Sequence, residues 1–156
     1  MKLKLDEKTA KRLYTESPEW FQAILIENFG EKAFAPKNFT DFITFDDICR
    51  ACDTTEEFFN SKFNDFGLSS DTIAYEKLKL INKAINGNWT ADWNNSSQRK
   101  YYPYFNLSSG FGFSTTDYFY AGTYSLVGSR LCYESTEKCE YAAKQFISIY
   151  KDFFTK

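Results

Sequence analysis

Four cysteines are the residues of this chain best suited to chemistry, because the sequence contains no histidine. Without imidazole, Ser-His-Asp catalysis, Cys-His catalysis and histidine-ligated zinc are all excluded. Cys49 and Cys52 form a C-x-x-C pair, and Cys132 and Cys139 form a second pair with six residues between them. Four thiolates could bind a zinc ion, and a C-x-x-C pair could be redox-active.

The elements expected around these cysteines favour a structural role instead. Cys132 is predicted at the end of a strand and Cys139 inside a helix, so the second pair lacks the tight turn of a zinc knuckle. The first pair has no thioredoxin-like βαβ context. We therefore expect four small buried apolar side chains in a reducing compartment, with no metal, no disulfide and no cofactor.

Carboxylates are the other source of chemistry, since Asp and Glu number 21. An Asp/Glu-based hydrolase or a metal-dependent nuclease stays open, although no motif pairs these residues. Asp92, Asn94 and Ser96 alternate as in a calcium loop, but Pro103 occupies the twelfth position, where a bidentate glutamate is needed. The sequence also lacks a phosphate-binding loop and a dinucleotide fingerprint. These observations favour a protein that is not an enzyme.

The segment 98–122 is rich in aromatic residues, with nine Phe or Tyr. Its aromatic and threonine content predicts two strands joined at residues 108–110, and residues 129–134 are expected to form a third. Pro103 has no N–H to donate, so its strand should lie at an edge or carry a bulge there. Alternation then predicts an inward group facing the C-terminal helix: Tyr101, Phe105, Leu107, Phe111, Phe113 and Phe119.

The outward group of the same strands is predicted to be Tyr102, Tyr104, Tyr118 and Tyr120, with Arg99 or Arg130 near its rim. Large aromatic residues and arginine are typical of interaction hot spots. The candidate binding residues are therefore Trp89, Trp93, Arg99, Lys100, Tyr102, Tyr104, Tyr118, Tyr120 and Arg130.

Three other interpretations of these rings stay open. They could stack on the bases of a single-stranded nucleic acid. Residues 110–113, Gly-Phe-Gly-Phe, match part of an RNA-recognition-motif signature, although Ser109 replaces its basic residue. The third interpretation is structural: the tryptophan-bearing loop folds over the core and the tyrosines pack the sheet.

The N-terminal part of the chain predicts a series of helices. Asp6 is expected to cap the first, Ser17 to cap a second that begins with Pro18, and Gly30 to end it. The second helix should bury one face, made of Trp20, Phe21, Ile24, Leu25 and Phe29.

Two short helices are expected next, the first capped by Thr44. A capping box formed by Thr54 and Glu57 should start the other. The pair is similar to a helix-turn-helix, but Asp46 and Asp47 would face DNA phosphates badly, so an αα-hairpin is the preferred interpretation.

Two longer amphipathic helices complete the prediction. Ala74, Leu78, Ile81 and Ile85 form the apolar stripe of a helix over residues 70–87. In residues 135–154, apolar side chains recur at helical spacing around Phe146, which predicts one long helix packed on the sheet.

Together these elements predict a single α+β domain. Its helical half covers residues 1–86, and a small antiparallel β-meander with the C-terminal helix covers residues 87–156. The net charge of -2 disfavours non-specific DNA binding. Since the sequence shows neither a signal peptide nor an apolar run of membrane-spanning length, we expect a soluble cytoplasmic protein. The sequence does not predict an oligomeric state.

Several blocks along the chain carry a family resemblance, namely "NGNWTADWNNSSQRKYYPYFNLSSGFGF", "VGSRLCYES", "YAAKQFISIYKDF", "RLYTESPEWFQAILIENFG" and "FITFDDICRA". They resemble a family of small uncharacterised proteins encoded by phages, prophages and mobile elements of Bacteroidetes. The usual form there is similar to Gly-Trp-x-Pro-Asp-Trp, then Gln-x-Lys-Tyr-Tyr-Pro-Trp-Phe. This chain lacks the proline, with Ala91 in its place, and has Tyr104 for the tryptophan of the second block.

This resemblance spans most of the chain and implies a mobile-element context without a mechanism. We therefore expect a non-catalytic accessory binding protein whose target is a host or phage protein. A single-stranded nucleic-acid binder and a carboxylate-based enzyme are the alternatives.

Overall fold

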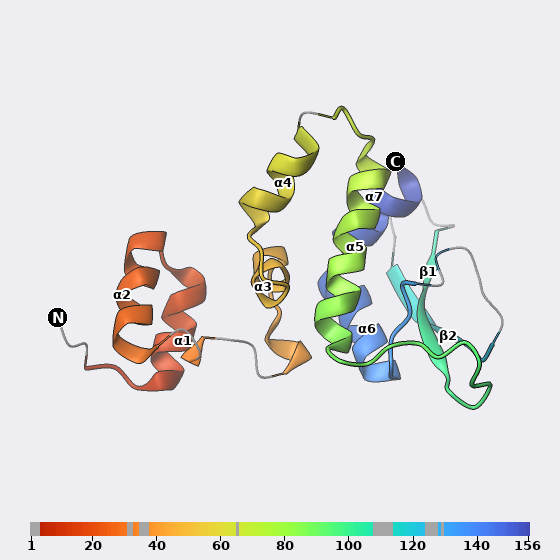
Figure 1. Cartoon of the computed structure of the whole chain (residues 1–156), viewed down its shortest axis with the longest axis horizontal. Coiled ribbons are helices and arrows are strands. Elements are labelled where there is room, and N and C mark those ends of the chain that lie inside the picture. The colour runs from red at the N-terminus through yellow and green to blue at the C-terminus, as the bar shows by residue number, and fades with distance from the viewer. Residues whose placement is uncertain are drawn as a thin grey trace. The chain divides into compact units, whose positions relative to one another are not determined.

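The computed structural model describes residues 4–30, 33–34, 38–64, 66–107, 114–123, 128 and 130–156. Contacts divide the chain into two compact units, Met1–Lys37 and Asn38–Lys156. The described residues form seven α-helices and a two-stranded antiparallel sheet (Figure 1), which confirms the predicted α+β class.

The first unit contains two helices, α1 (Glu7–Glu16) and α2 (Glu19–Phe29). Asp6 caps α1 as predicted, because its carboxylate accepts a hydrogen bond from the Thr9 backbone N–H at 2.8 Å. Pro18 rather than Ser17 occupies the capping position of α2, and no side chain caps that helix. Gly30 ends α2 at a φ of 80°, a conformation that favours glycine.

The two helices of the first unit bury Ala10 and Leu25 completely. The ring of Tyr14 stacks on that of Phe34, with 4.5 Å between their centroids. Of the five apolar residues predicted on the buried face of α2, only Leu25 is buried, and Trp20 is 67% exposed. The prediction for that face was therefore wrong at Trp20.

The second unit begins with the 3-10 turn η2 (Phe39–Asp41), α3 (Phe45–Ala51) and α4 (Glu56–Asn64). Thr44 caps α3 as predicted, in a capping box with Asp47. The capping box predicted for α4 is wrong by one residue. The Thr55 hydroxyl, not that of Thr54, accepts a hydrogen bond at the start of α4, from the Phe58 backbone N–H at 3.1 Å.

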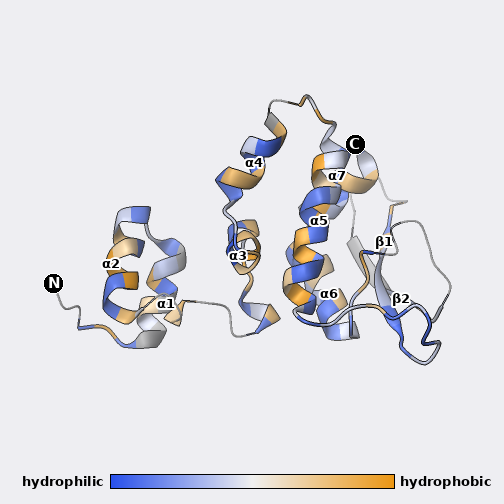
Figure 2. Ribbon diagram, viewed as in Figure 1, coloured by the Kyte–Doolittle hydropathy of each residue, from blue (hydrophilic) through white to orange (hydrophobic). Residues whose placement is uncertain are grey.

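The long helix α5 (Ser70–Asn86) buries the stripe predicted from its sequence: Ala74, Leu78, Ile81 and Ile85. Gly87 ends the helix at a φ of 61°, where a glycine avoids backbone strain. Hydrophobic and hydrophilic residues alternate in bands along α5 (Figure 2), as expected for a helix with one buried side.

Strands β1 (Lys100–Asn106) and β2 (Ser114–Ala121) form the antiparallel hairpin. Their register shifts between Tyr104 and Phe105, so the predicted irregularity lies just after Pro103. The N–H and carbonyl of Tyr101 point away from β2, toward Tyr133. Two residues further along the strand, Pro103 faces the same edge, where its missing N–H removes no bond to β2.

The third strand predicted at residues 129–134 is reduced, in its described residues, to a single bridge. Tyr133 exchanges backbone hydrogen bonds of 2.8 and 3.0 Å with Tyr101. Among the described residues the predicted meander is therefore a hairpin with one bridging residue beside it. The strand-like composition of this segment does not produce a full strand, and Gly128 and Arg130 lie in turns.

The C-terminal segment forms two helices, α6 (Thr136–Gln145) and α7 (Ile147–Thr155), where one long helix was predicted. The break falls at Phe146, whose φ of −110° and ψ of 29° are not helical. The helix α6 packs against α5 and against both strands, so it links the helices of this unit to the hairpin (Figure 1).

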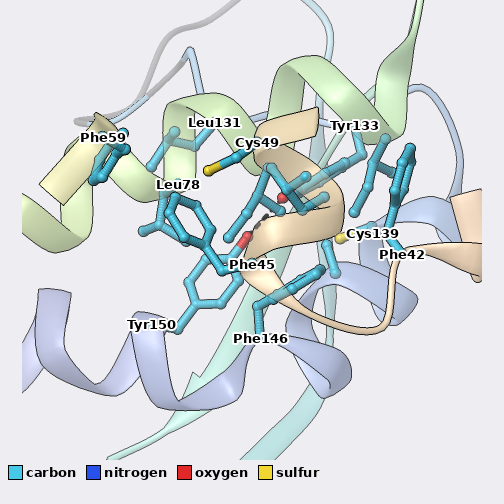
Figure 3. Close-up of a cluster of buried hydrophobic side chains, with 14 residues drawn as sticks. Phe42, Phe45, Cys49, Phe59, Leu78, Leu131, Tyr133, Cys139, Phe146 and Tyr150 are labelled. Atoms are coloured by element: carbon cyan, nitrogen blue, oxygen red, sulfur yellow. Dashed lines mark hydrogen bonds between the residues drawn. The ribbon is translucent and has the colours of Figure 1, made fainter. Parts of the chain in front are cut away.

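The main core of the second unit is a cluster of buried side chains from α3, α4, α5, α6, α7 and the segment before α6. Figure 3 shows its largest members, with the hydroxyls of Tyr133 and Tyr150 facing each other in the middle. Because α5 packs directly on α6 and α7, the boundary drawn near residue 86 does not separate two compact units. That residues 1–156 fold as one domain stays a prediction.

Candidate binding surface

The pairing of β1 with β2 assigns the aromatic side chains of the hairpin to two faces. Tyr101 lies opposite Tyr120, and Tyr102 lies opposite Phe119. Directly opposed residues of an antiparallel pair point to the same face. The inner face therefore carries Tyr101, Pro103, Phe105, Tyr118 and Tyr120, and the outer face carries Lys100, Tyr102, Tyr104, Phe119 and Ala121.

The predicted faces are right for β1 and wrong for β2. Tyr101 and Phe105 pack against the main core as expected, but Tyr118 joins them there. Phe119, predicted to face inward, lies on the outer face and is 49% exposed. The reason is physical: the alignment of β2 follows from its pairing with β1 and from the register shift, and the polarity of a tyrosine tip does not reveal that alignment. Phe111 and Phe113 lie outside the described residues.

One half of the outer face is covered. Tyr102, Ala121 and Cys132 form a small buried cluster, against which Trp89 and Ala91 pack. We call residues 87–99 the Trp loop. In this half of the face the aromatic residues pack inside the protein, as the structural interpretation predicted, since Tyr102 is only 9% exposed.

Lys100 holds the Trp loop in place. Its side chain is completely buried, and its ammonium donates to the backbone carbonyls of Asp92 at 2.6 Å, Asn95 at 3.1 Å and Gln98 at 2.8 Å. All three donors of the ammonium are thereby used. Lys100, predicted as a candidate binding residue, therefore serves as an internal cation for the loop, and its charge does not reach the surface.

The loop also makes hydrogen bonds within itself. The Gln98 side chain accepts from the Asp92 N–H at 2.6 Å, and the Asp92 carboxylate accepts from the Asn94 N–H at 2.9 Å. The Lys100 ammonium lies 5.4 Å from the centre of the Trp93 ring, and Trp93 is 36% exposed. The carbonyls of this loop thus converge on the Lys100 ammonium, whereas the oxygens of a calcium-binding loop would converge on a calcium ion.

The other half of the outer face is open to solvent. Tyr104 is 63% exposed and Phe119 is 49% exposed. Tyr104 and Phe119 are diagonal neighbours, because Tyr104 pairs with Asp117, two residues before Phe119. We call these two residues the open patch. Phe119 was predicted to lie in the core, and so was Leu107, which lies just after β1 and is 56% exposed.

The remaining candidate residues lie elsewhere. Arg99 is exposed, and its guanidinium lies 4.7 Å from the centre of the Tyr120 ring, on the inner side of the hairpin. Arg130 is exposed in the turn before Cys132. The nine predicted binding residues therefore do not form one surface: Trp89, Lys100 and Tyr102 are structural, and Tyr104 belongs to the open patch.

The four cysteines are free thiols, and Cys49, Cys132 and Cys139 are buried. Burial raises the pKa of Cys49 to about 12 and that of Cys139 to about 12, and it also raises the pKa of Cys52 and Cys132. Such thiols stay protonated at neutral pH and are poor nucleophiles. Within the described residues, no three Cys, Asp or Glu side chains are grouped so that they could hold a metal ion.

Buried polar groups in the described part of the chain have structural partners. Asn82 and Asn86 of α5 donate to the Cys132 carbonyl at 2.6 and 2.8 Å, and Asn86 also accepts from the Glu134 N–H at 3.1 Å. These bonds attach the segment before α6 to α5. Asn86 and Lys100 are the buried polar side chains there, so no buried carboxylate pair is found among the described residues.

Comparison with known proteins adds no relative: no family model, no curated protein and no solved structure matches this chain. No helix in the described ranges is both long and apolar enough to cross a membrane.

Proposed function

We propose that this chain is a non-catalytic accessory binding protein that contacts another protein through the open patch on its hairpin. The observation that carries the proposal is the exposure of Tyr104 and Phe119 side by side on one face, 63% and 49% respectively. Large rings displayed together on a rigid strand pair are typical of the anchors that dominate protein interfaces.

The support for the hairpin is what makes the patch suitable for recognition. On its inner face, Tyr101, Phe105 and Tyr118 pack against the main core, and α6 contacts both strands. The rings of the open patch are therefore displayed by backbone that is already ordered. A surface of this kind loses little conformational entropy when a partner binds.

A protein partner fits the charge distribution better than a single-stranded nucleic acid. Nucleic-acid binding needs cationic groups that track the backbone beside the stacking rings. The Lys100 charge, on the same face as the patch, is buried and bound by backbone carbonyls. Arg99 lies over Tyr120 on the inner side. The described outer face thus offers rings without a neighbouring row of available cations.

The sequence resemblance to proteins of phages and mobile elements in Bacteroidetes supplies the context for this proposal. In that context the partner is a host or phage protein. The absence of a buried carboxylate pair among the described residues removes the observation that would have favoured a carboxylate-based enzyme.

Affinity capture tests the proposal. Tagged wild-type protein and a Tyr104→Thr, Phe119→Thr double variant are incubated with host and phage-infected lysates, with and without nuclease. Threonine is chosen because it keeps the strand propensity of both positions while removing the rings. We expect one or more proteins to be retained by the wild type in both treatments and lost by the double variant. Capture that disappears with nuclease would instead identify a nucleic-acid binder, and capture unaffected by the double variant would exclude the open patch.

A further inference from the structure

The Trp loop and the open patch occupy one continuous face of the hairpin. Tyr102 and Tyr104 are two residues apart on β1, so their side chains point the same way. Tyr102 is 9% exposed under Trp89 and Ala91, whereas Tyr104 is 63% exposed. The edge of the Trp loop, and not a change of face, therefore separates the covered half from the open half.

A single side chain provides strong attachment between the loop and the strand. The Lys100 ammonium donates to three backbone carbonyls within residues 92–98. Its hydrogen bonds to the first and last of these, Asp92 and Gln98, are 2.6 and 2.8 Å long. Other hydrogen bonds of the loop, such as those between Gln98 and Asp92 or Thr90, are internal to it. The loop thus has its own internal structure and is held to β1 through Lys100.

The floor beneath the loop is fixed independently. The carbonyl of Cys132 accepts hydrogen bonds from Asn82 and Asn86, which belong to α5. Ala121 belongs to β2, which is paired with β1. The loop can therefore separate from this cluster while the residues under it keep their places. The apolar contacts that must be broken are those of Trp89 and Ala91, both of which are only partly buried.

We infer that the Trp loop is a cover over the outer face of the hairpin, and that the Lys100 ammonium holds it closed. This inference rests on the proposed function, whose binding face it regulates. With the loop open, Tyr102 adds to Tyr104 and Phe119 in one aromatic face. With the loop closed, only the open patch is available to a partner.

The thiol of Cys132 reports on the loop directly. It is 3% exposed and lies in the cluster under Trp89 and Ala91. Cys49 and Cys139 lie in the main core and are completely buried. Labelling with iodoacetamide, resolved by peptide mass spectrometry, therefore distinguishes opening of the loop from unfolding of the unit. The labelling rate follows the population of the open form when opening and closing are faster than the chemistry.

The first variant is Lys100→Met, which keeps most of the apolar stem and removes all three donors. We expect the labelling rate of Cys132 to rise at least about tenfold, because three charge-assisted hydrogen bonds of the closed form are lost. The rates of Cys49 and Cys139 should change less than about twofold. The matched control is Lys83→Met, at an exposed lysine of α5, which should leave all three rates unchanged.

The second variant, Gly122→Ala, displaces the loop without touching Lys100. A Cβ at this position would lie 3.0 Å from the Ser96 carbonyl oxygen, which is backbone of the Trp loop. The loop must shift to relieve that contact, so Cys132 labelling should again rise selectively. This variant decides the matter if Lys100→Met unfolds the whole unit.

Unchanged Cys132 labelling in both variants would overturn the inference, as would labelling that rises only in step with Cys49 and Cys139. The experiment needs no partner, so its result is separate from the proposed function. If Cys132 labelling rises selectively but partner capture survives the Tyr104→Thr, Phe119→Thr double variant, the loop opens as inferred and the open patch is excluded as the binding surface.

Discussion

Two tyrosine hydroxyl groups meet inside the main core of the second unit. The oxygens of Tyr133 and Tyr150 are 2.8 Å apart, which is hydrogen-bonding distance. Both tyrosines are at most 2% exposed. In such a place a hydroxyl needs a partner, since leaving a buried polar group unsatisfied costs about 1–3 kcal/mol. Each of the two hydroxyls therefore serves as the hydrogen-bond partner of the other.

Removing either hydroxyl should destabilise the protein. Tyr133→Phe leaves the Tyr150 hydroxyl without this partner, and Tyr150→Phe does the same to Tyr133, so each should lower the free energy of unfolding by about 1–3 kcal/mol. The double variant should cost less than the sum of the two single variants, because neither hydroxyl is then left unsatisfied. Urea denaturation measures all three, and additive costs for the two single variants would contradict this account.

The adjacent threonines before α4 give a second contrast. The Thr55 hydroxyl accepts from the Phe58 N–H at 3.1 Å, whereas the Thr54 hydroxyl is buried and has no hydrogen-bond partner among the described residues. Thr55→Val should lower the free energy of unfolding by about 0.5–2 kcal/mol, the usual effect of losing a helix cap. Thr54→Val should be neutral or stabilising, because it removes an unsatisfied polar group. A loss of more than about 1 kcal/mol in Thr54→Val would show that this hydroxyl has a partner.

At the scale of the elements, helix caps and apolar stripes depend on residues close in sequence and could be predicted. The face on which a strand residue lies depends on the pairing of β1 with β2 and could not. The caps at Asp6 and Thr44 and the stripe of α5 follow from neighbouring residues, and the structure confirms them. The face of Phe119 depends on which residue of β1 it meets, and no local pattern states that. The buried Lys100 could not be foreseen either, because its three acceptors are backbone carbonyls that any sequence supplies.

Phe146 marks the point where packing overrides a continuous helical pattern. Its backbone leaves the helical region between α6 and α7, while its side chain is 4% exposed in the main core. Phe146→Ala should therefore lower the free energy of unfolding by about 3–5 kcal/mol, the range for truncating a buried phenylalanine. Phe154→Ala, at a position that is 48% exposed on α7, is the control and should cost far less. A cost below about 1 kcal/mol for Phe146→Ala would mean that its ring is not part of the core.

On the scale of the whole molecule, the described groups whose pKa is raised by burial are thiols and phenols. Burial raises the pKa of Cys49 and Cys139 to about 12, and it raises the pKa of Tyr102, Tyr133 and Tyr150 well above their ordinary values. A group whose pKa is raised by folding stabilises the protein below its unfolded pKa. That contribution is lost as the pH rises toward the folded pKa.

The free energy of unfolding should therefore fall as the pH rises above about 9, where the thiols of the unfolded chain begin to ionise. Between about pH 6 and 8 it should be nearly flat, since the sequence contains no histidine. Urea denaturation across pH 6–11 measures both parts of the curve. A marked change between pH 6 and 8, or constant stability up to pH 11, would be inconsistent with the buried thiols and phenols.

The central claim is that the open patch is the protein's partner-binding surface, and its most direct test is a dissociation constant. Once a captured partner is purified, its affinity is measured for the wild type, for Tyr104→Thr, Phe119→Thr and for Phe66→Ala. Phe66 is 74% exposed and lies between α4 and α5, away from the hairpin in sequence and element. We expect the double variant to bind at least about 30-fold more weakly, as loss of hot-spot residues does. Its free energy of unfolding should stay within about 1 kcal/mol of the wild type, and Phe66→Ala should bind normally. Equal affinity of the double variant and the wild type would contradict the claim.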